Sequence, residues 1–273
     1  MPRSRVYRCR YAARSRILFL GLIFALVSGL LAGVTVSGQT APANQAKSQP
    51  WITKEYSEWP QLVLTNRATF LKASDLDGAS AFLIRSPNGQ VLCSAAKHLV
   101  GPAGGVEPRI PLTKLNESLV SWVVYPRTQP EKKIRLGELA ISTANEQSHD
   151  CLLLTINKGD EKELPSQPLT IREKPAVIGE TVYLVGVAYV DTKAKQNVYK
   201  GTVTSRVGNR FRYTIDPPVD IRGFSGAPIL DKDGFVLGSM AVWFERAQKN
   251  GKDAESGAQD MSTVLPLILP TSK

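Results

Sequence analysis

The sequence predicts an all-β fold, because its apolar residues occur in short runs and turn residues separate one run from the next. Clusters of Pro, Asn, Asp and Gly mark these turns, as at residues 86–89 and 231–234. Little of the chain shows the spacing of an amphipathic helix. Many short strands of this kind form a barrel or a sandwich. The runs that predict strands are residues 81–85, 91–94, 119–125, 151–156, 182–190, 212–215 and 236–244.

The N-terminal region, residues 1–43, has the pattern of an export segment. Residues 1–16 contain six arginines and no acidic residue, and residues 17–36 form an apolar run. This pattern is typical of a signal peptide, and Ala41-Pro42-Ala43 offers a cleavage site after Ala43. The apolar run is also long enough for an uncleaved signal anchor. Both alternatives predict an extracytoplasmic domain (periplasmic, secreted or membrane-anchored) that contacts a membrane only through this segment.

The rest of the chain is long enough for one domain of about 200 residues with a sizeable core. Its formal charge of +10 does not indicate a nucleic-acid partner. Residues 1–43 hold six of the 34 basic residues and none of the 24 acidic ones, and the remaining charges of both signs are interspersed. A mixed, solvated surface is the simpler interpretation. Residues 44–74 have the composition of a linker and N-terminal extension.

A serine between glycines, Gly223-Phe224-Ser225-Gly226, precedes a short apolar run and a turn. A nucleophilic serine needs an exposed hydroxyl on a tight turn, and nearby backbone N–H groups that face the developing oxyanion. Glycine permits both the unusual backbone angles and the close approach. The motif alone also fits an ordinary turn.

The chain has two histidines, His98 and His149, so a catalytic base has few candidates. His98 follows an apolar strand, and Asp150 opens another, where a carboxylate can orient an imidazole. His149 is adjacent to Asp150, so on a strand its side chain points to the opposite face and makes a poor base. The order is therefore His98, Asp150 and Ser225, separated by 52 and 75 residues.

These motifs resemble the chymotrypsin-like (trypsin-fold) serine peptidases, and most of all the bacterial HtrA/Deg branch. The segments around His98 (94–98), Asp150 (150–154) and Ser225 (221–228) are similar to the three triad motifs of that family. Structural segments at 179–186, 201–203 and 234–238 also match in order, so the likeness covers residues 75–270.

The resemblance implies two six-stranded antiparallel β-barrels with the active site in the cleft between them. The first barrel would span about 75–157 and carry His98 and Asp150. The second would span about 178–270 and carry Ser225. It also implies an oxyanion hole formed by the backbone N–H groups of Gly223 and Ser225, and protein or peptide substrates. No Cys/His spacing in the sequence indicates a metal site, and no cofactor is expected.

Four departures from the family pattern stand out. Phe224 replaces the aspartate that pairs with a newly cut N-terminus in digestive enzymes, so that route of activation is not expected. Ser94 and Ala95 stand near the position of a family threonine, and Ala227 replaces a glycine. No PDZ-sized region follows residue 270.

In the family, the residues before the nucleophile turn and those on the strand after it line the specificity pocket. By resemblance these are Val219, Asp220, Ile221, Ser239, Met240 and Ala241. They favour a small or aliphatic substrate side chain, although Asp220 offers an alternative preference for a basic one. The polar stretch 250–259 is expected to form an exposed loop near the site.

Three properties stay open from the sequence. Cys93 and Cys151 would lie on neighbouring strands of the first barrel, where they could form either a disulfide or two buried thiols. The function is either an exported serine endopeptidase or, alternatively, a trypsin-fold pseudoenzyme or latent peptidase that serves as a protein-binding module. The sequence does not predict the oligomeric state.

Overall fold

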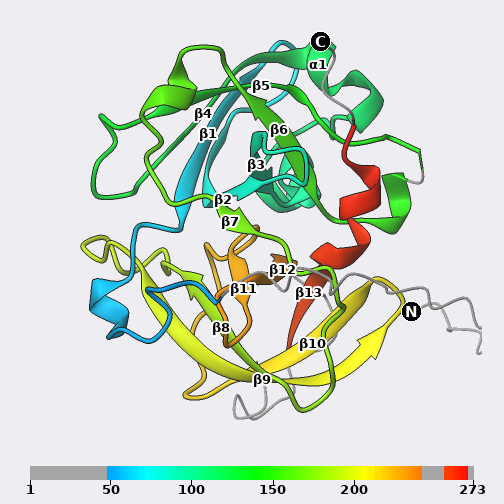
Figure 1. Cartoon of the computed structure of the whole chain (residues 1–273). Helices are drawn as coiled ribbons and strands as arrows, with labels where there is room; N and C mark the ends of the chain where they lie inside the picture. Colours follow the sequence, from blue (N-terminus) through cyan, green and yellow to red (C-terminus); the bar gives the residue numbers. More distant parts are fainter. Residues whose placement is uncertain (1–47, 145, 242–254, 270–273) are drawn as a thin grey trace, which may run out of the picture. The chain divides into compact units, whose positions relative to one another are not determined.

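The computed structural model describes residues 48–144, 146–241 and 255–269, which belong to one compact unit, residues 46–273. Strands and short helical turns make up this unit, as Figure 1 shows. Its short α-helix α1 (Leu115–Ser118) follows one of several 3-10 turns. These turns are Tyr56–Glu58, Lys97–Val100, Pro102–Gly104, Leu112–Lys114, Glu146–Ser148, Asp160–Lys162, Met261–Thr263 and Leu265–Leu267.

The first barrel, in the upper half of Figure 1, consists of six antiparallel strands. They run in the order β1-β4-β5-β6-β3-β2, and pairing of β1 with β2 closes the ring. The strands are β1 (Leu64–Phe70), β2 (Leu76–Arg85), β3 (Val91–Ala95), β4 (Leu119–Tyr125), β5 (Ile134–Leu139) and β6 (Leu152–Ile156).

The second barrel, in the lower half of Figure 1, is also closed by six antiparallel strands, in the order β10-β13-β12-β11-β8-β9. The predicted all-β fold with two six-stranded barrels is thus confirmed. The strands are β8 (Thr181–Gly186), β9 (Asn197–Val207), β10 (Arg210–Ile215), β11 (Pro228–Leu230), β12 (Val236–Ala241) and β13 (Ser256–Asp260).

Three hydrophobic cores hold the unit together, one inside each barrel and one between them. Strands β2, β3 and β6 contribute to two cores at once, because successive side chains point to opposite faces. On β2, for example, Leu83 packs inside the first barrel, whereas Phe82 and Ile84 pack between the barrels. Burial on both faces explains why these strands are continuous apolar runs in the sequence.

The alternation of side chains along the strands also decides whether Cys93 and Cys151 form a disulfide or remain two buried thiols. Cys93 on β3 belongs to the core of the first barrel, and Cys151, just before β6, belongs to the core between the barrels. Both thiols are free and buried. Side chains on opposite faces of paired strands cannot be bridged without backbone movement. Two buried thiols are therefore what the structure contains.

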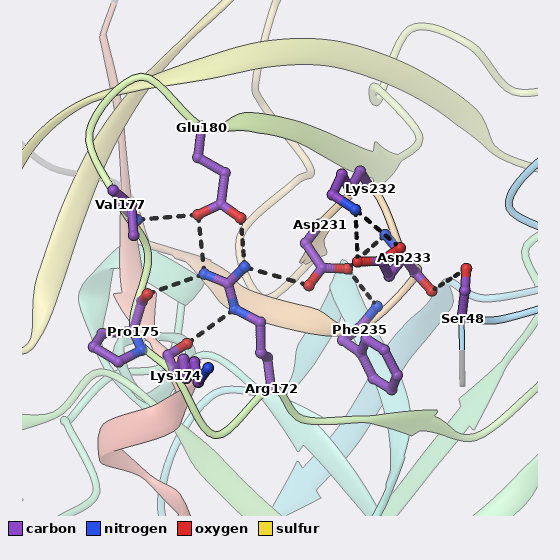
Figure 2. A network of polar contacts seen from close by, with 10 residues as sticks. All are labelled: Ser48, Arg172, Lys174, Pro175, Val177, Glu180, Asp231, Lys232, Asp233 and Phe235. Atoms are coloured by element: carbon purple, nitrogen blue, oxygen red, sulfur yellow. Dashed lines mark hydrogen bonds and ion pairs between the residues drawn. The ribbon is translucent and has the colours of Figure 1, made fainter. Parts of the chain in front are cut away.

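The segment that crosses between the barrels contains β7 (Leu169–Thr170), which pairs in parallel with β2. Two residues after β7, Arg172 occupies the centre of the polar network in Figure 2. Its guanidinium donates to Glu180, to Asp231 at 3.4 Å, and to the carbonyls of Lys174 (2.9 Å) and Pro175 (3.0 Å). All five guanidinium N–H groups are thereby used, which fixes the crossing segment to the second barrel.

The first barrel begins earlier than residue 75, the boundary expected from the resemblance. Strand β1 lies within the stretch 44–74 expected to be linker, yet it pairs with both β2 and β4. Its sequence LTNRATF includes buried Asn66, whose amide oxygen accepts a 3.1 Å hydrogen bond from Trp122 Nε1. A polar side chain on the inner face hides the alternation by which a strand is predicted.

Other boundaries also differ from the expectation. Strand β8 ends at Gly186, and residues 187–196 form a loop to β9. Residues 256–259 are not an exposed loop, because they lie in the fully buried strand β13. Residues 242–244 of the last predicted strand and residues 250–254 lie outside the described residues.

The predicted export segment, residues 1–43, also lies outside the described part of the chain. Within the described residues, no helix combines the length and apolar character needed to span a membrane.

Candidate active site

The serine motif folds into two consecutive turns. The Ile221 carbonyl accepts from Phe224 N–H at 3.1 Å, and the Phe224 carbonyl accepts from Ala227 N–H at 2.7 Å. The third position of each turn is a glycine with positive φ, 99° at Gly223 and 85° at Gly226. A glycine with this φ at the third position is the signature of a type II turn. The G-x-x-G spacing thus provides the backbone angles that both turns require.

Ser225 occupies the second position of the second turn and is half-buried. The adjoining backbone pairs with β12, since Gly226 N–H donates to the Met240 carbonyl at 2.8 Å and Met240 N–H donates to the Ala227 carbonyl at 2.8 Å. The second barrel therefore holds the serine turn (residues 221–227) by its C-terminal end.

The first barrel holds the same turn from the other side. Ser80 on β2 donates its N–H to the Ser225 carbonyl at 2.9 Å and its Oγ–H to the Gly223 carbonyl at 2.8 Å. Gly226 packs so closely that an added Cβ would lie 2.3 Å from the Ser80 carbonyl oxygen and 3.0 Å from the Ala96 nitrogen. Ala96 immediately precedes the 3-10 turn that carries His98, so Ser225 lies near that turn.

His98 and Asp150 are joined by two hydrogen bonds. The ring Nδ1 lies 2.8 Å from Asp150 Oδ2, and the backbone N–H of His98 lies 2.9 Å from Oδ1. Because Nδ1 donates to the carboxylate, the lone pair of the neutral ring lies on Nε2. This Nε2 is buried and has no hydrogen-bond partner among the described residues. It is the nitrogen that is available to a nearby hydroxyl.

Burial and hydrogen bonding act in opposite directions on Asp150. Burial raises the pKa of its carboxyl, but the hydrogen bonds and charge of His98, together with the charge of Arg210, outweigh that effect. The pKa of Asp150 therefore lies below its ordinary value. The carboxylate is ionised at neutral pH and can orient the His98 ring and stabilise its protonated form.

Gln259 on β13 supports Asp150, a role that was not predicted from the sequence. Its amide oxygen accepts the Asp150 N–H at 2.9 Å, and its amide nitrogen donates to the Asn209 carbonyl at 2.9 Å and to Thr263 Oγ1 at 3.1 Å. The side chain is fully buried. Its surroundings in the sequence are small and polar, so no local pattern identifies it. The Asp150 carboxylate bonds to His98, the histidine expected to be the base.

Two backbone N–H groups at the serine turn are unused. The N–H groups of Gly223 and Ser225 have no hydrogen-bond partner among the described residues. They are the two donors expected to form an oxyanion hole. Phe224 between them is fully buried, and its ring meets Tyr199 edge-on with centroids 5.5 Å apart. A packing contact therefore anchors the middle of the turn in the second barrel.

The six residues expected to line the specificity pocket are in different environments. Met240 is buried in the core of the second barrel, and Val219 and Ile221 pack against that core. Ser239 is buried, with an Oγ that lacks a partner among the described residues, and Ala241 is also buried.

Asp220 is exposed and bonded to Arg222 Nε at 2.9 and 3.0 Å. These hydrogen bonds, together with the charge of Arg222, lower the pKa of Asp220. Arg222 thus already neutralises the carboxylate that could have attracted a basic substrate side chain.

A cavity of about 260 Å³ borders Gly223 on the side facing β2. None of the six expected pocket residues lines it. Its walls include Ser80 on β2, Arg127 after β4, and Tyr189 on the β8–β9 loop (residues 187–196). No local sequence pattern links these three residues to the serine, so they could not be predicted. Within the described residues, no three His, Cys, Asp or Glu side chains form a group that could hold a metal ion.

Two antiparallel six-stranded barrels, with a His–Asp pair from one and a serine turn from the other, define the chymotrypsin-like fold of serine peptidases. The family model for the trypsin-like peptidase domain matches residues 57–238, which is more than half of the chain and includes His98, Asp150 and Ser225. The chain therefore belongs to this family, and the predicted resemblance is confirmed.

Solved structures agree on the fold. The active form of the Rv3671c protease from M. tuberculosis is 19% identical, with 83% of this chain and 90% of that chain covered and a TM-score of 0.51. Kallikrein-related peptidase 10 is 15% identical, with 76% and 92% covered and a TM-score of 0.51. At these identities the similarity shows the fold alone. A comparison with curated proteins finds no match.

Proposed function

We propose that this chain is a serine endopeptidase in which Ser225 is the nucleophile, His98 the general base and Asp150 the residue that orients His98. The observation that carries the proposal is the His98–Asp150 pair, whose 2.8 Å bond leaves a buried Nε2 near the serine turn with no partner in the described part of the chain. Membership of the trypsin-like peptidase family supports the same reaction class.

The reaction would run through an acyl-enzyme. Ser225 Oγ attacks the carbonyl carbon of the scissile peptide bond while its proton passes to His98 Nε2. The negative charge that develops on the carbonyl oxygen is stabilised by the N–H groups of Gly223 and Ser225. Protonated His98 then gives the proton to the leaving amine, and the C–N bond breaks. Water repeats the sequence on the ester and releases the acid.

The absence of a hydrogen bond between Ser225 and His98 is compatible with this role. Catalytic hydrogen bonds are often long in proteins without substrate and tighten when the substrate binds. The N–H groups of Gly223 and Ser225, which no described residue accepts from, also favour an enzyme over the alternative of a binding module, because a module has no need to keep them unpaired.

The substrates would be proteins or peptides outside the cytoplasm. This location is proposed from the basic and apolar pattern of residues 1–43. A fusion of alkaline phosphatase after residue 60 tests it. Phosphatase activity is expected, since that enzyme needs an oxidising compartment for its disulfides, and an inactive fusion would contradict export.

The peptidase activity is tested by incubating the full-length protein with a mixture of synthetic peptides and identifying the products by mass spectrometry. We expect internal cleavage with wild type and none with Ser225→Ala. Equal cleavage by both proteins would contradict the proposal. Binding of peptides without cleavage by folded wild type would indicate the binding module instead.

A further inference from the structure

The orientation of one peptide bond decides whether the site can bind an oxyanion. In a planar trans peptide, the carbonyl and the N–H point in opposite directions. The Arg222–Gly223 peptide is the central peptide of a type II turn, as the φ of 99° at Gly223 indicates. A type I turn has this peptide rotated by about 180°. Such a flip would turn the Gly223 N–H away and present the Arg222 carbonyl to the oxyanion.

The β8–β9 loop holds this peptide in its present orientation. Tyr189 N–H donates a 3.2 Å hydrogen bond to the Arg222 carbonyl, which is the atom that a flip would displace. The contact is close, because a Cβ added at Gly223 would lie 3.1 Å from the Val187 carbonyl oxygen and 3.3 Å from the Tyr189 nitrogen. Phe224, the next residue of the turn, is apolar, so it has no charged group that could hold the Arg222–Gly223 peptide in place.

Arg127 of the first barrel fixes the loop in turn. It follows β4, and its two terminal nitrogens donate to the carbonyls of Ala188 and Tyr189, each at 3.0 Å. A forked guanidinium that bonds two successive carbonyls sets both position and orientation. The far end of the loop is tied to the N-terminal arm (residues 48–62), since Gln196 Nε2 donates to the Pro60 carbonyl at 2.7 Å.

Strand β2 adds a second tether to the same loop. The Tyr189 hydroxyl accepts the Ala79 N–H at 3.1 Å. Ala79 has a φ of 57°, the one positive value among the described non-glycine residues. Non-glycine residues adopt this conformation only where their surroundings impose it, and such sites cluster at functional positions. The neighbouring Ser80 makes two of the hydrogen bonds to the serine turn.

We infer that Arg127 and Tyr189 are positioning residues that keep the Gly223 N–H directed into the oxyanion hole. Arg127 acts through the β8–β9 loop and Tyr189 acts directly on the Arg222 carbonyl. The inference rests on the proposed function, because it assigns a role within the same site. A residue of the first barrel, Arg127, thereby fixes the orientation of the Gly223 N–H group in the second barrel.

Kinetics of Arg127→Met and Arg127→Lys test the inference. The substrate is a fluorogenic peptide that wild type cleaves, and the inhibitor is the aldehyde of the same peptide, whose hemiacetal needs the oxyanion hole. We expect Arg127→Met to lower kcat about 10- to 100-fold with KM unchanged, short of the 10²–10³-fold loss of a deleted donor. Inhibition by the aldehyde should weaken by the same factor.

Matched variants separate positioning from stability and from substrate contact. The single ammonium group of Arg127→Lys can donate to only one of the two loop carbonyls. We therefore expect the kcat of Arg127→Lys to lie between that of wild type and that of Arg127→Met. Tyr189→Phe loses only the bond to Ala79 and should lower kcat less than Arg127→Met does. Arg135→Met removes an exposed arginine on β5 that pairs with Asp160 and should leave kcat unchanged.

The contrary outcomes are distinct. A rise in KM with kcat unchanged, or unchanged kinetics in both Arg127→Met and Tyr189→Phe, would overturn the inference while the proposed function stands. If Arg127→Met does not fold, Arg127→Lys and Tyr189→Phe decide the question. A folded wild type that neither cleaves peptides nor binds the aldehyde would overturn the proposed function, and this inference with it.

Discussion

The Asp150 carboxylate accepts two hydrogen bonds from His98, one from the ring and one from the backbone. The ring bond selects the tautomer whose Nε2 can accept a proton. The backbone bond fixes the carboxylate relative to the 3-10 turn that carries the ring. Gln259 holds the Asp150 backbone from the second barrel, so both barrels contribute to the position of this pair.

Asp150→Asn should preserve the fold and remove most of the activity. An amide at this position can donate to Nδ1 and so favour the wrong tautomer of His98. We expect kcat to fall about 10⁴-fold, as it does for the equivalent change in Ser-His-Asp triads. Steady-state kinetics beside a thermal melt check this, and a variant that keeps more than a tenth of wild-type kcat would contradict the role of Asp150.

The lowered pKa of Asp150 predicts a pH-dependent contribution to stability. A carboxyl whose pKa is lower in the folded state stabilises the fold above its unfolded pKa, near 3.8, and loses that contribution as the pH falls through the folded value. Wild type should therefore exceed Asp150→Asn in unfolding free energy at pH 7 by more than it does at pH 3. Urea denaturation at both pH values measures the two differences, and equal differences would contradict the assignment.

Gly226→Ala should damage the serine turn, because the new methyl would lie 2.3 Å from the Ser80 carbonyl oxygen at a φ of 85°. The left-handed conformation alone costs a residue with a Cβ about 1–2 kcal/mol. Gly89→Ala is the matched control, since Gly89 has a φ of 88° with no atom near the added methyl. We expect both variants to lose stability, but only Gly226→Ala to lose at least tenfold in kcat/KM. Equal kinetics in the two variants would show that the close contact has no catalytic consequence.

Arg172→Met should destabilise the whole unit, because Glu180 and the buried Asp231 would lose their cationic partner (Figure 2). Removing one member of a buried ion pair costs about 3–5 kcal/mol. The Arg172 side chain is 20% exposed, so we expect a loss in unfolding free energy near the lower end of this range, about 3 kcal/mol. At 2–4 °C per kcal/mol this is a fall in Tm of about 6–12 °C. Arg135→Met, which removes an exposed pair, should leave Tm almost unchanged, and equal falls in both variants would contradict the importance of the network.

The two described cysteines should not react with a thiol reagent in the folded protein. Burial raises the pKa of Cys151 to about 12 and that of Cys93 still further, so neither forms the reactive thiolate. Titration with an aromatic disulfide reagent, before and after denaturation without reductant, should reveal two additional thiols on unfolding. If denaturation exposes no additional thiols, Cys93 and Cys151 form a disulfide, which would contradict the structure.

Sequence reasoning predicted the fold class and brought His98 and Asp150 together because their signals are local. A serine between glycines and a carboxylate at the start of an apolar strand are visible in a few residues each. Strand β13 shows no such signal, since its buried residues are small or polar and become a strand only by closing the second barrel.

The surroundings of the six residues expected to line the substrate pocket were harder to predict for a related reason. A β-bulge between β11 and β12 leaves Leu237 without a direct partner, so the side-chain alternation changes along β12. The bulge therefore determines on which face of the strand the Ser239, Met240 and Ala241 side chains lie. The tethers from Ser80, Arg127 and Tyr189 depend on contacts across more than 30 residues, and a single sequence does not show them.

Labelling with a fluorophosphonate probe tests the activated serine itself. The full-length wild-type protein, Ser225→Ala and His98→Ala are treated in parallel, and the modified residue is located by peptide mapping. We expect one adduct on Ser225 in wild type, none on Ser225→Ala, and a loss of at least 10³-fold in labelling rate for His98→Ala. No adduct on the folded wild type, or an adduct on any other residue, would contradict the assignment of Ser225 as the nucleophile.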